Sequence, residues 1–270
     1  MPVGIKVSNK AGYVEVSWNN VSGAQKYSVY RKTPDTKWTR ISILNAAVSG
    51  DSAAKTTVSD KKVEEGTDYI YTVKAYAGKV ASAYDEDGVT TRYLGTGKIT
   101  SLTNTKTGVT IKWQETEGAG GYLIYRKAGK GKFVRIAKLS GGETNSYCDE
   151  TAVNGKGYTY AVRPFYGSSN GTYEEAKTVR LSVSSIVSAK NNKAGTIQVT
   201  WKKNSKVTGY QVKYTASGKS KAVYENGTSV ELKNLKKGTT CRVYVRGYRT
   251  VLGKKYFGPW SSGKTVKITK

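Results

Sequence analysis

Basic and aromatic side chains alternate with valine in one short segment of the sequence. Arg242, Tyr244 and Arg246 take every second position, and Val243 and Val245 stand between them. Cationic groups attract anions, and aromatic rings stack on bases and pack on sugar rings, so this set of residues could bind a charged chain. Further cations and rings that could join it are Lys213, Lys254, Lys255, Tyr256 and Trp260.

Residues suited to acid–base, nucleophilic or metal chemistry are scarce. The sequence has no histidine, which removes the commonest general base and metal ligand. Its two cysteines, Cys148 and Cys241, are far apart, so neither a zinc site nor an intradomain disulfide is expected. Cys148 is expected on a polar turn, exposed but not activated. No phosphate-binding loop or serine elbow occurs, so we expect no enzyme, no cofactor and no metal.

The densest acidic cluster is the run 85–87, Asp-Glu-Asp. Its carboxylates could hold calcium, but no calcium-loop spacing accompanies them. A charge cluster at a hairpin tip is the favoured interpretation.

Composition indicates an ordered chain of two or three domains. The 270 residues are 37% hydrophobic, with 30 glycines and 4 prolines, which fits neither disorder nor a collagen-like sequence. No apolar run approaches the roughly 18 residues that a membrane span needs. The first residues lead straight into strand-like sequence without a signal peptide, so an exported protein would be represented here by a fragment.

A tryptophan pattern recurs three times. Segments 14–18, 109–113 and 197–201 alternate apolar and polar residues and end in Trp18, Trp113 and Trp201, which are 95 and 88 residues apart. That alternation is typical of a half-buried strand.

Two further patterns accompany each copy of the tryptophan pattern. A tyrosine opens the next strand nine residues after each tryptophan, at Tyr27, Tyr122 and Tyr210. A later alternating strand starts at Tyr69, Tyr158 or Cys241, in each case shortly after a glycine. Asn-Gly pairs at 170–171 and 226–227 add turn signals, and no segment has a helical period. Short strands and turns at this spacing predict a β-sandwich in each repeat.

At these residues the chain resembles the fibronectin type III family. The resemblance covers nearly the whole sequence and implies a core tryptophan on the second strand of each domain. It also implies a tyrosine that ties down a corner, here Tyr69 and Tyr158. The third repeat has Cys241 at that position, but Leu235 keeps the corner leucine, so we expect the fold without the corner hydrogen bond.

The resemblance implies an all-β fold of three tandem immunoglobulin-like (fibronectin type III) sandwiches in an extended arrangement. The expected domains are 1–94, 95–182 and a strongly basic 183–270, joined by short linkers. The richness in tyrosine and lysine is similar to that of repeats in secreted and wall-associated proteins of Gram-positive bacteria. Arg-Gly-Asp, the integrin motif of animal members, is absent.

Charge is distributed unevenly along the chain, whose net value is +26. Residues 1–94 carry 13 basic and 10 acidic side chains, net +3, and residues 95–182 carry 13 and 7, net +6. Residues 183–270 carry 19 and 2, net +17. Such a polycationic domain is expected to attract polyanions.

Strand alternation, together with the resemblance, places the candidate binding residues in space. If Val243 and Val245 face the core, Arg242, Tyr244 and Arg246 share the opposite face. Because the third and sixth strands are neighbours in this fold, Lys213 should join them. The final hairpin should bring Lys254, Lys255 and Tyr256 nearby. The alternative for each residue is a solvated face that keeps the protein soluble.

Two tryptophans lie outside the core pattern. Trp38 matches Phe133 in the second repeat, which favours packing across a sheet. Trp260 has no equivalent and is the better candidate glycan platform, together with Tyr244 and Tyr256, although packing against a neighbouring strand is the alternative.

We therefore predict a non-catalytic, monomeric spacer or adhesion segment of an extracellular, cell-surface or cell-wall protein. Its basic domain would contact an anionic cell-wall polymer or polysaccharide. Two alternatives stay open: an accessory carbohydrate-binding segment of a larger secreted hydrolase, and a module that binds a host surface protein.

Overall fold

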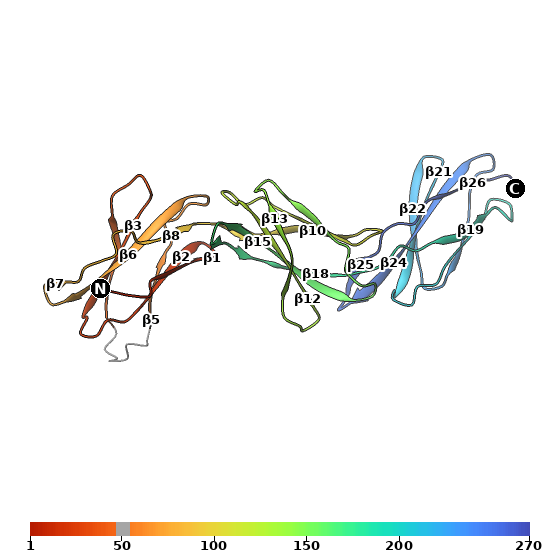
Figure 1. Cartoon of the computed structure of the whole chain (residues 1–270). Helices are drawn as coiled ribbons and strands as arrows, with labels where there is room; N and C mark the ends of the chain where they lie inside the picture. Colours follow the sequence, from red (N-terminus) through yellow and green to blue (C-terminus); the bar gives the residue numbers. More distant parts are fainter. Residues whose placement is uncertain (47–54) are drawn as a thin grey trace.

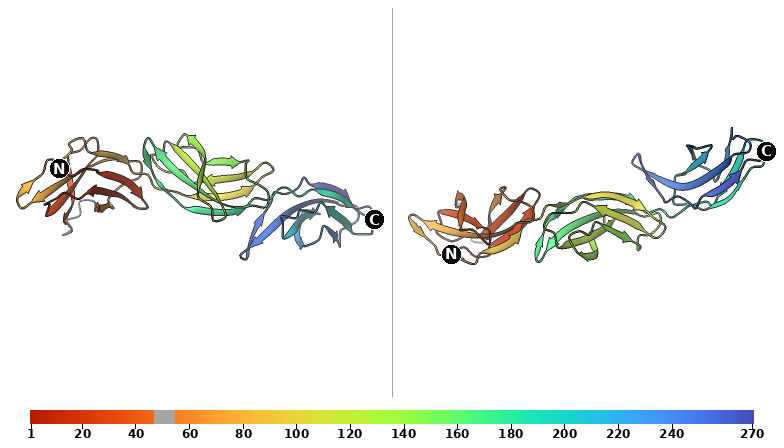
Figure 2. Two further views of the ribbon diagram at one scale, coloured as in Figure 1. Left: turned by 60° about the horizontal axis from the view of Figure 1, so that its bottom comes forward. Right: turned by 90° about the horizontal axis from the view of Figure 1, so that it is seen from above.

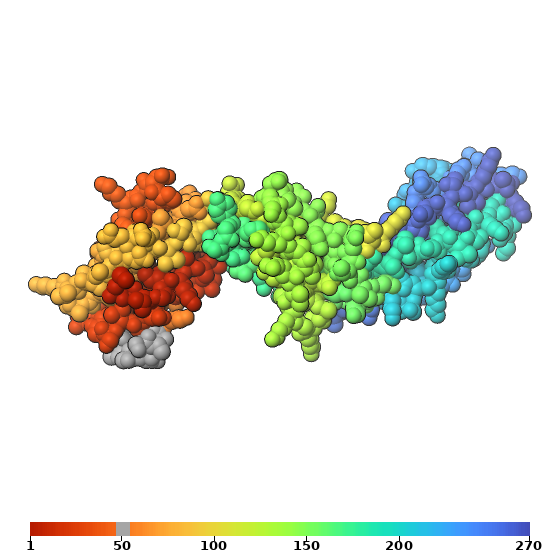
Figure 3. Space-filling view, in the orientation of Figure 1, coloured from red at the N-terminus to blue at the C-terminus, as the bar shows by residue number. Residues whose placement is uncertain are grey.

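The computed structural model describes residues 1–46 and 55–270, and it contains three β-sandwiches in a row (Figure 1). Every regular element in these two ranges is a strand, so the described residues include no helix that could cross a membrane. Two further views keep the same end-to-end order, and the space-filling view has three lobes (Figures 2 and 3). The predicted all-β fold of tandem sandwiches is confirmed. The boundaries 1–94, 95–182 and 183–270 stay a prediction, and these ranges are called the first, second and third repeat.

Each repeat has a three-stranded sheet facing a larger one. The first repeat contains β1 (Lys6–Lys10), β2 (Tyr13–Asn19), β3 (Lys26–Lys32), β4 (Thr39–Asn45), β5 (Lys55–Asp60), β6 (Asp68–Ala77), β7 (Val80–Ala81) and β8 (Val89–Arg92). One sheet has the order β1-β2-β5 and the other β4-β3-β6-β7. Because β7 and β8 both pair with β6, they act as one edge strand that residues 82–88 interrupt.

The second repeat follows the same plan. Its strands are β9 (Thr96–Gly97), β10 (Ile99–Asn104), β11 (Val109–Trp113), β12 (Gly121–Ala128), β13 (Val134–Ser140), β14 (Ser146–Asp149), β15 (Gly157–Tyr166), β16 (Ser169–Asn170), β17 (Thr172–Tyr173) and β18 (Glu175–Val179). The two main sheets have the orders β10-β11-β14 and β13-β12-β15-β16, with β18 also pairing with β15, and β9 and β17 form a short parallel pair.

The third repeat has the longest strand. Its strands are β19 (Ile186–Lys190), β20 (Ile197–Trp201), β21 (Gly209–Ala216), β22 (Lys219–Glu225), β23 (Ser229–Leu232), β24 (Thr240–Val251), β25 (Lys254–Phe257) and β26 (Lys264–Lys267). The sheets have the orders β19-β20-β23 and β22-β21-β24-β25, with β26 also pairing with β24.

Each sandwich has its own core, built around the repeated tryptophan. Trp18, Trp113 and Trp201 are at most 3% exposed, and the buried residues form three separate clusters, one in each repeat. On β2, alternate side chains are buried, as the period-two pattern predicts. Burying a large apolar side chain contributes roughly 1.5–3 kcal/mol, so each repeat carries its own stabilising core.

The tyrosine nine residues after each tryptophan packs on it and holds a loop. The ring centroids of Trp18 and Tyr27 are 5.3 Å apart, and the equivalent pairs in the other repeats are 5.3 and 5.4 Å apart. Each tyrosine hydroxyl accepts a hydrogen bond from a backbone amide six residues earlier, for example from Val21 to Tyr27 at 2.8 Å. The fixed spacing thus joins the two sheets and anchors the loop between their strands.

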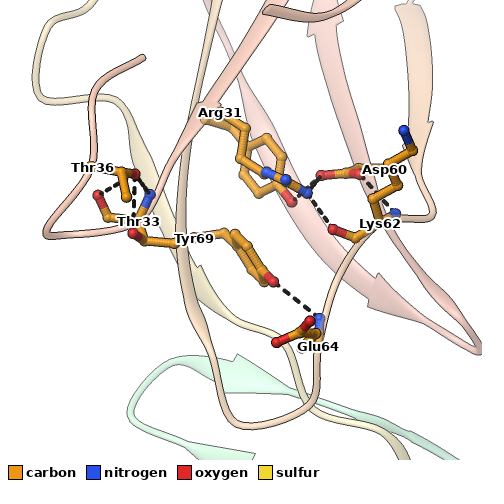
Figure 4. Close-up of polar contacts among 8 residues, drawn as sticks. Arg31, Thr33, Thr36, Asp60, Lys62, Glu64 and Tyr69 are labelled. Atoms are coloured by element: carbon orange, nitrogen blue, oxygen red, sulfur yellow. Dashed lines mark hydrogen bonds and ion pairs between the residues drawn. The ribbon is translucent and has the colours of Figure 1, made fainter. Parts of the chain in front are cut away.

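The predicted tyrosine corners are present in the first two repeats. The Tyr69 hydroxyl accepts a 3.0 Å hydrogen bond from the Glu64 amide (Figure 4), and Tyr158 accepts one of 3.1 Å from Val153. In the third repeat Cys241 is fully buried and Leu235 is 8% exposed. Burial raises the pKa of the Cys241 thiol. This corner is therefore apolar.

The first two repeats also bury a charged triad that the sequence did not reveal. In the first, Asp60 binds Arg31 at 2.8 Å and the Tyr71 hydroxyl at 2.9 Å (Figure 4 shows the ion pair). In the second, the Asp149 carboxylate accepts 2.7 Å hydrogen bonds from both Arg126 and Tyr160.

The triad shifts the pKa of its members. Burial raises the pKa of Asp149, but hydrogen bonds from Tyr160, Thr151 and Arg126 and the Arg126 charge outweigh burial, and the pKa is lowered. Burial and the Asp149 carboxylate raise the pKa of Tyr160. The carboxylate is thus kept ionised inside the sandwich.

The third repeat replaces the whole triad with uncharged core side chains. By strand register, Tyr214, Leu232 and Val243 occupy the places of the arginine, aspartate and tyrosine. All three are at most 9% exposed and belong to the core. An apolar set of matching shape is often as stable as a buried ion pair, whereas removing one partner is costly.

Specific polar contacts join the repeats. Between the first two, the Arg92 guanidinium lies 3.6 Å from the Tyr166 ring centroid, and the Arg92 amide donates to Ser169 at 2.9 Å. Between the second and third, Arg249 donates to the Gly155 carbonyl at 2.7 Å. Asn104 donates to the Phe257 carbonyl at 2.9 Å. These contacts support the extended arrangement.

Three local predictions were wrong. The hairpin between β15 and β16 turns at Gly167, which takes the positive φ of 55°, so Asn170 lies on a strand. Cys148 is partly buried on β14, where Thr110 is its cross-strand partner, and does not lie on a turn. The run 85–87 lies between β7 and β8, not at a hairpin tip.

We expect the triad of the second repeat to be replaceable only as a unit. Asp149→Leu should destabilise this repeat by about 3–5 kcal/mol, because Arg126 and Tyr160 lose their buried partner. The triple variant R126Y/D149L/Y160V, copied from the third repeat, should recover most of that loss. Denaturant-dependent, peptide-resolved hydrogen exchange of residues 95–182 measures both variants. A single variant as stable as the wild type would contradict this account.

Acid should weaken the second repeat. The pKa of Asp149 in the folded protein lies below the ordinary carboxyl value. The ionised Asp149 carboxylate therefore stabilises the fold above about pH 4, and this stabilisation is lost as the pH falls further. Hydrogen exchange at pH 5 and pH 3 should reveal the loss in residues 95–182, with the third repeat as reference in the same sample. The triple variant should not show it, and equal acid sensitivity in both proteins would disprove the link to Asp149.

Candidate functional site

The candidate binding face lies on β21 and β24 of the third repeat. Along β24, Val243 and Val245 are fully buried, and Arg242, Tyr244 and Arg246 alternate with them on the outer face. Lys213 on β21 lies directly across from Tyr244. The structure therefore brings these four predicted residues together.

Cations and rings alternate along this face. Arg242 lies 5.2 Å and Lys213 5.1 Å from the Tyr244 ring centroid. Lys213 is also 5.1 Å from the Trp260 ring, and Arg246 is 4.3 Å from it. Arg246 continues the series at 4.0 Å from the ring of Phe257. We call this set the cation–aromatic ladder: Arg242, Tyr244, Lys213, Trp260, Arg246 and Phe257.

The ladder continues onto the final hairpin. Phe257 packs against Tyr248, its cross-strand partner, with ring centroids 6.0 Å apart. Lys255 then lies 5.4 Å from the Tyr248 ring and 5.0 Å from the ring of Tyr224 on β22. Lys255 thus extends the row of cations on the same face.

Lys254 and Tyr256 lie near Arg246 and Trp260, as expected of the final hairpin, but they do not belong to the ladder. They flank Lys255 on β25, and side chains alternate across a strand, so both point to the opposite face. Tyr256 lines a depression together with Tyr158 and Val179 of the second repeat. Lys254 lies 5.4 Å from the Tyr256 ring.

Backbone contacts fix Trp260 over β24. The Ser261 amide donates to the Val245 carbonyl at 2.8 Å, and the Val245 amide donates to the Ser261 hydroxyl at 3.0 Å. Gly263 lies so close that a Cβ there would come within 2.7 Å of the Tyr244 ring. Ser261 and Gly263 position the ladder, and sequence reasoning missed both.

Little negative charge offsets the ladder. The ion pairs found in the described part of the third repeat both use Glu231, with Lys193 and Lys233. Arg246 instead donates to the neutral Gln211 side chain at 2.8 Å. Burial lowers the pKa of Arg246, yet a guanidinium stays cationic at any physiological pH. The cations of this face therefore contact aromatic rings and are not paired with carboxylates.

Cations already lie over two of the rings proposed as a glycan platform. Tyr244 and Trp260 each have two cations over them. A sugar ring stacking there would compete with those cations. The arrangement is better suited to electrostatic attraction and guanidinium hydrogen bonding than to stacking.

The other candidates do not join this face. Trp38 packs at 6.4 Å against Tyr84, with Lys32 4.7 Å from its ring. Cys148 contacts the Thr107 hydroxyl at 3.8 Å. In the run 85–87, the Asp87 amide donates to the Asp85 carboxylate at 3.1 Å. Residues 1–46 and 55–270 contain no cluster of three or more histidine, cysteine or acidic residues that could hold a metal ion.

Comparison with known proteins found a family model that covers most of the third repeat. Residues 182–263 match the family model described as fibronectin type III domain. Among solved structures, the crystal structure of the FN1–FN3 domains of chicken CNTN1 aligns with 100% of this chain and 98% of its own, at 20% identity and a TM-score of 0.34. No curated protein matches the sequence.

We expect Trp260 to stabilise the third repeat. Trp260→Ala should destabilise residues 183–270 by about 1–2 kcal/mol, because two cations lose a ring at roughly 0.5–1 kcal/mol each. Hydrogen exchange in β21 and β24 measures the change. Trp38→Ala in the first repeat is the matched control and should leave these strands unaffected. Unchanged exchange in W260A would show that the ring contributes no packing.

Proposed function

We propose that this chain is an extended, non-catalytic spacer or adhesion segment of a secreted or cell-surface protein, attached through its third repeat to an anionic polymer of the cell envelope. The match of residues 182–263 to the fibronectin type III model supports a role as a spacer or adhesion module. In this proposal the first two repeats, net +3 and +6, provide reach, and the third, net +17, provides attachment.

The observation that carries the proposal is the cation–aromatic ladder. Its cations lie in a row and lack carboxylate partners in the described part of the chain. Uncompensated cations on one face attract polyanions and release their counterions, which favours binding.

The shape of the row favours a linear polymer over a small anion. Arg242 lies near one end of the row and Lys255 near the other. Lys255 is the cross-strand partner of Thr250, which follows Arg242 by eight residues on β24. Eight residues of strand at about 3.3 Å each place these ends roughly 26 Å apart. Only an elongated ligand with repeated negative charges can contact the whole row.

Packing of the rings favours charge recognition over a neutral glycan. Tyr244 and Trp260 hold cations in place, and a sugar ring would have to compete for their faces. A polymer carrying phosphate, sulfate or carboxylate groups can instead bind the cations where they already lie.

The ladder should account for polyanion binding by the full chain. The double variant R242E/K255E reverses two exposed charges, and we expect it to reduce affinity for heparin, used as the probe, by at least ten-fold at 0.15 M salt. The slope of log affinity against log salt should also become shallower, because fewer counterions are released. Isothermal titration at several salt concentrations measures both quantities.

The control is K37E/K79E, which makes the same charge change on two exposed lysines of the first repeat. It should lower the affinity less than three-fold. If both double variants lose affinity equally, net charge and not the ladder governs binding. If neither loses affinity, the proposed function is wrong.

A further inference from the structure

A groove of about 920 Å³ runs between the second and third repeats, next to the ladder. On the side of the second repeat it is lined by β10 and by residues 175–178 of β18. On the side of the third repeat it is lined by residues 254–260 and by Arg246. Arg246, Phe257 and Trp260 belong to both the ladder and the groove, so the two surfaces are continuous.

The groove is itself cationic. Its charged lining residues are Lys177, Arg246, Lys254, Lys255 and Glu175. The one carboxylate, on Glu175, already pairs with Lys127 at 2.9 Å. Lys254 points away from the ladder but lines this groove, which gives it a place in the same positive surface.

Neutral donors complete the lining. β10, β18 and β25 are all edge strands, and each pairs with only one neighbour. Edge strands leave backbone groups without sheet partners. Thr100, Ser101 and Thr103, which carry hydroxyl groups, are among the residues that line the β10 side. Anionic oxygens in the groove could therefore receive hydrogen bonds as well as charge contacts.

Buried polar contacts fix the width of the groove. Asn104, at the end of β10, is 7% exposed and donates to the carbonyls of Val179 and Phe257 at 2.8 and 2.9 Å. It also accepts a 3.0 Å hydrogen bond from the Leu181 amide. One side chain thus joins β10, the linker and β25, and holds both walls in position.

We infer that the ladder and the groove form one continuous site, in which a single linear anionic polymer runs along β24, passes Arg246 and crosses the junction to Lys177 of the second repeat. This inference rests on the proposed function and extends it, because the site is then not contained in residues 183–270. Bound polymer would contact both repeats and hold the junction at one angle.

The test is Lys177→Glu in the full chain. Lys177 is exposed on β18 and lies outside the ladder, so its replacement should not disturb folding. We expect about five-fold weaker binding of long heparin chains, and no change for heparin fragments too short to reach from the ladder to Lys177. Lys132→Glu is the control, since Lys132 is an exposed lysine of the same repeat that does not line the groove.

Outcomes separate this inference from the proposed function. If K177E binds long chains as K132E does, while R242E/K255E binds weakly, the polymer stays on the third repeat and the inference is wrong. If K177E weakens short and long probes equally, it acts through general charge, which also overturns the inference. If R242E/K255E binds normally, the proposed function itself fails.

Discussion

The fold of every repeat depends on one contact, the packing of an indole against a phenol ring between two sheets. In each copy the tryptophan is on a strand of the smaller sheet and the tyrosine on a strand of the larger one. The ring pair excludes water from the core, while the tyrosine hydroxyl satisfies a loop amide that would otherwise be left without a partner. The tryptophan nitrogens, by contrast, are buried without a hydrogen-bond partner in all three repeats. That cost is tolerated three times, which indicates that filling the core matters more here than satisfying one donor.

The third repeat differs from the others in where it keeps its charges. The first two repeats each hold an arginine and an aspartate against the core, whereas Tyr214 and Leu232 replace them in the third. Its core needs no buried ion pair, and its arginines are on the surface or at the junction. With only two acidic residues, the third repeat must limit repulsion among its cations in another way. Aromatic rings serve that purpose, because a ring face attracts a cation without adding negative charge. Both the core and the ladder of the third repeat therefore do without carboxylates: the core uses uncharged side chains, and the ladder uses aromatic rings.

The sequence was sufficient to predict which side chains of one strand face the core. It was not sufficient to predict contacts that depend on the register between strands far apart in the chain. The tryptophan strands and the outward face of Arg242, Tyr244 and Arg246 follow from alternation, which one strand determines alone. The corner tyrosines were expected from the family resemblance. The buried triads went unrecognised because Arg31, Asp60 and Tyr71 lie on three strands, and no spacing in sequence reveals that they meet. Lys254 and Tyr256 were expected near this face, but their orientation was not predicted, because the hairpin register that orients them depends on its two-residue turn. Phe257 and Ser261 were missed because they act through Arg246 and Trp260, not through a pattern of their own.

The rings of the ladder bear on affinity as well as on solubility. A free lysine or arginine side chain samples many rotamers, and ordering it on binding costs roughly 0.5–1.5 kcal/mol. In the ladder, Lys213 lies near two rings and Arg246 is held between Phe257, Trp260 and the Gln211 amide. Much of the ordering has therefore occurred before any ligand arrives. A solvated lysine face of equal charge would attract polyanions over the same distance, but it would have to order each side chain on contact. The difference between the two lies in short-range affinity and not in long-range attraction, because the screening length in physiological salt is about 8 Å for both.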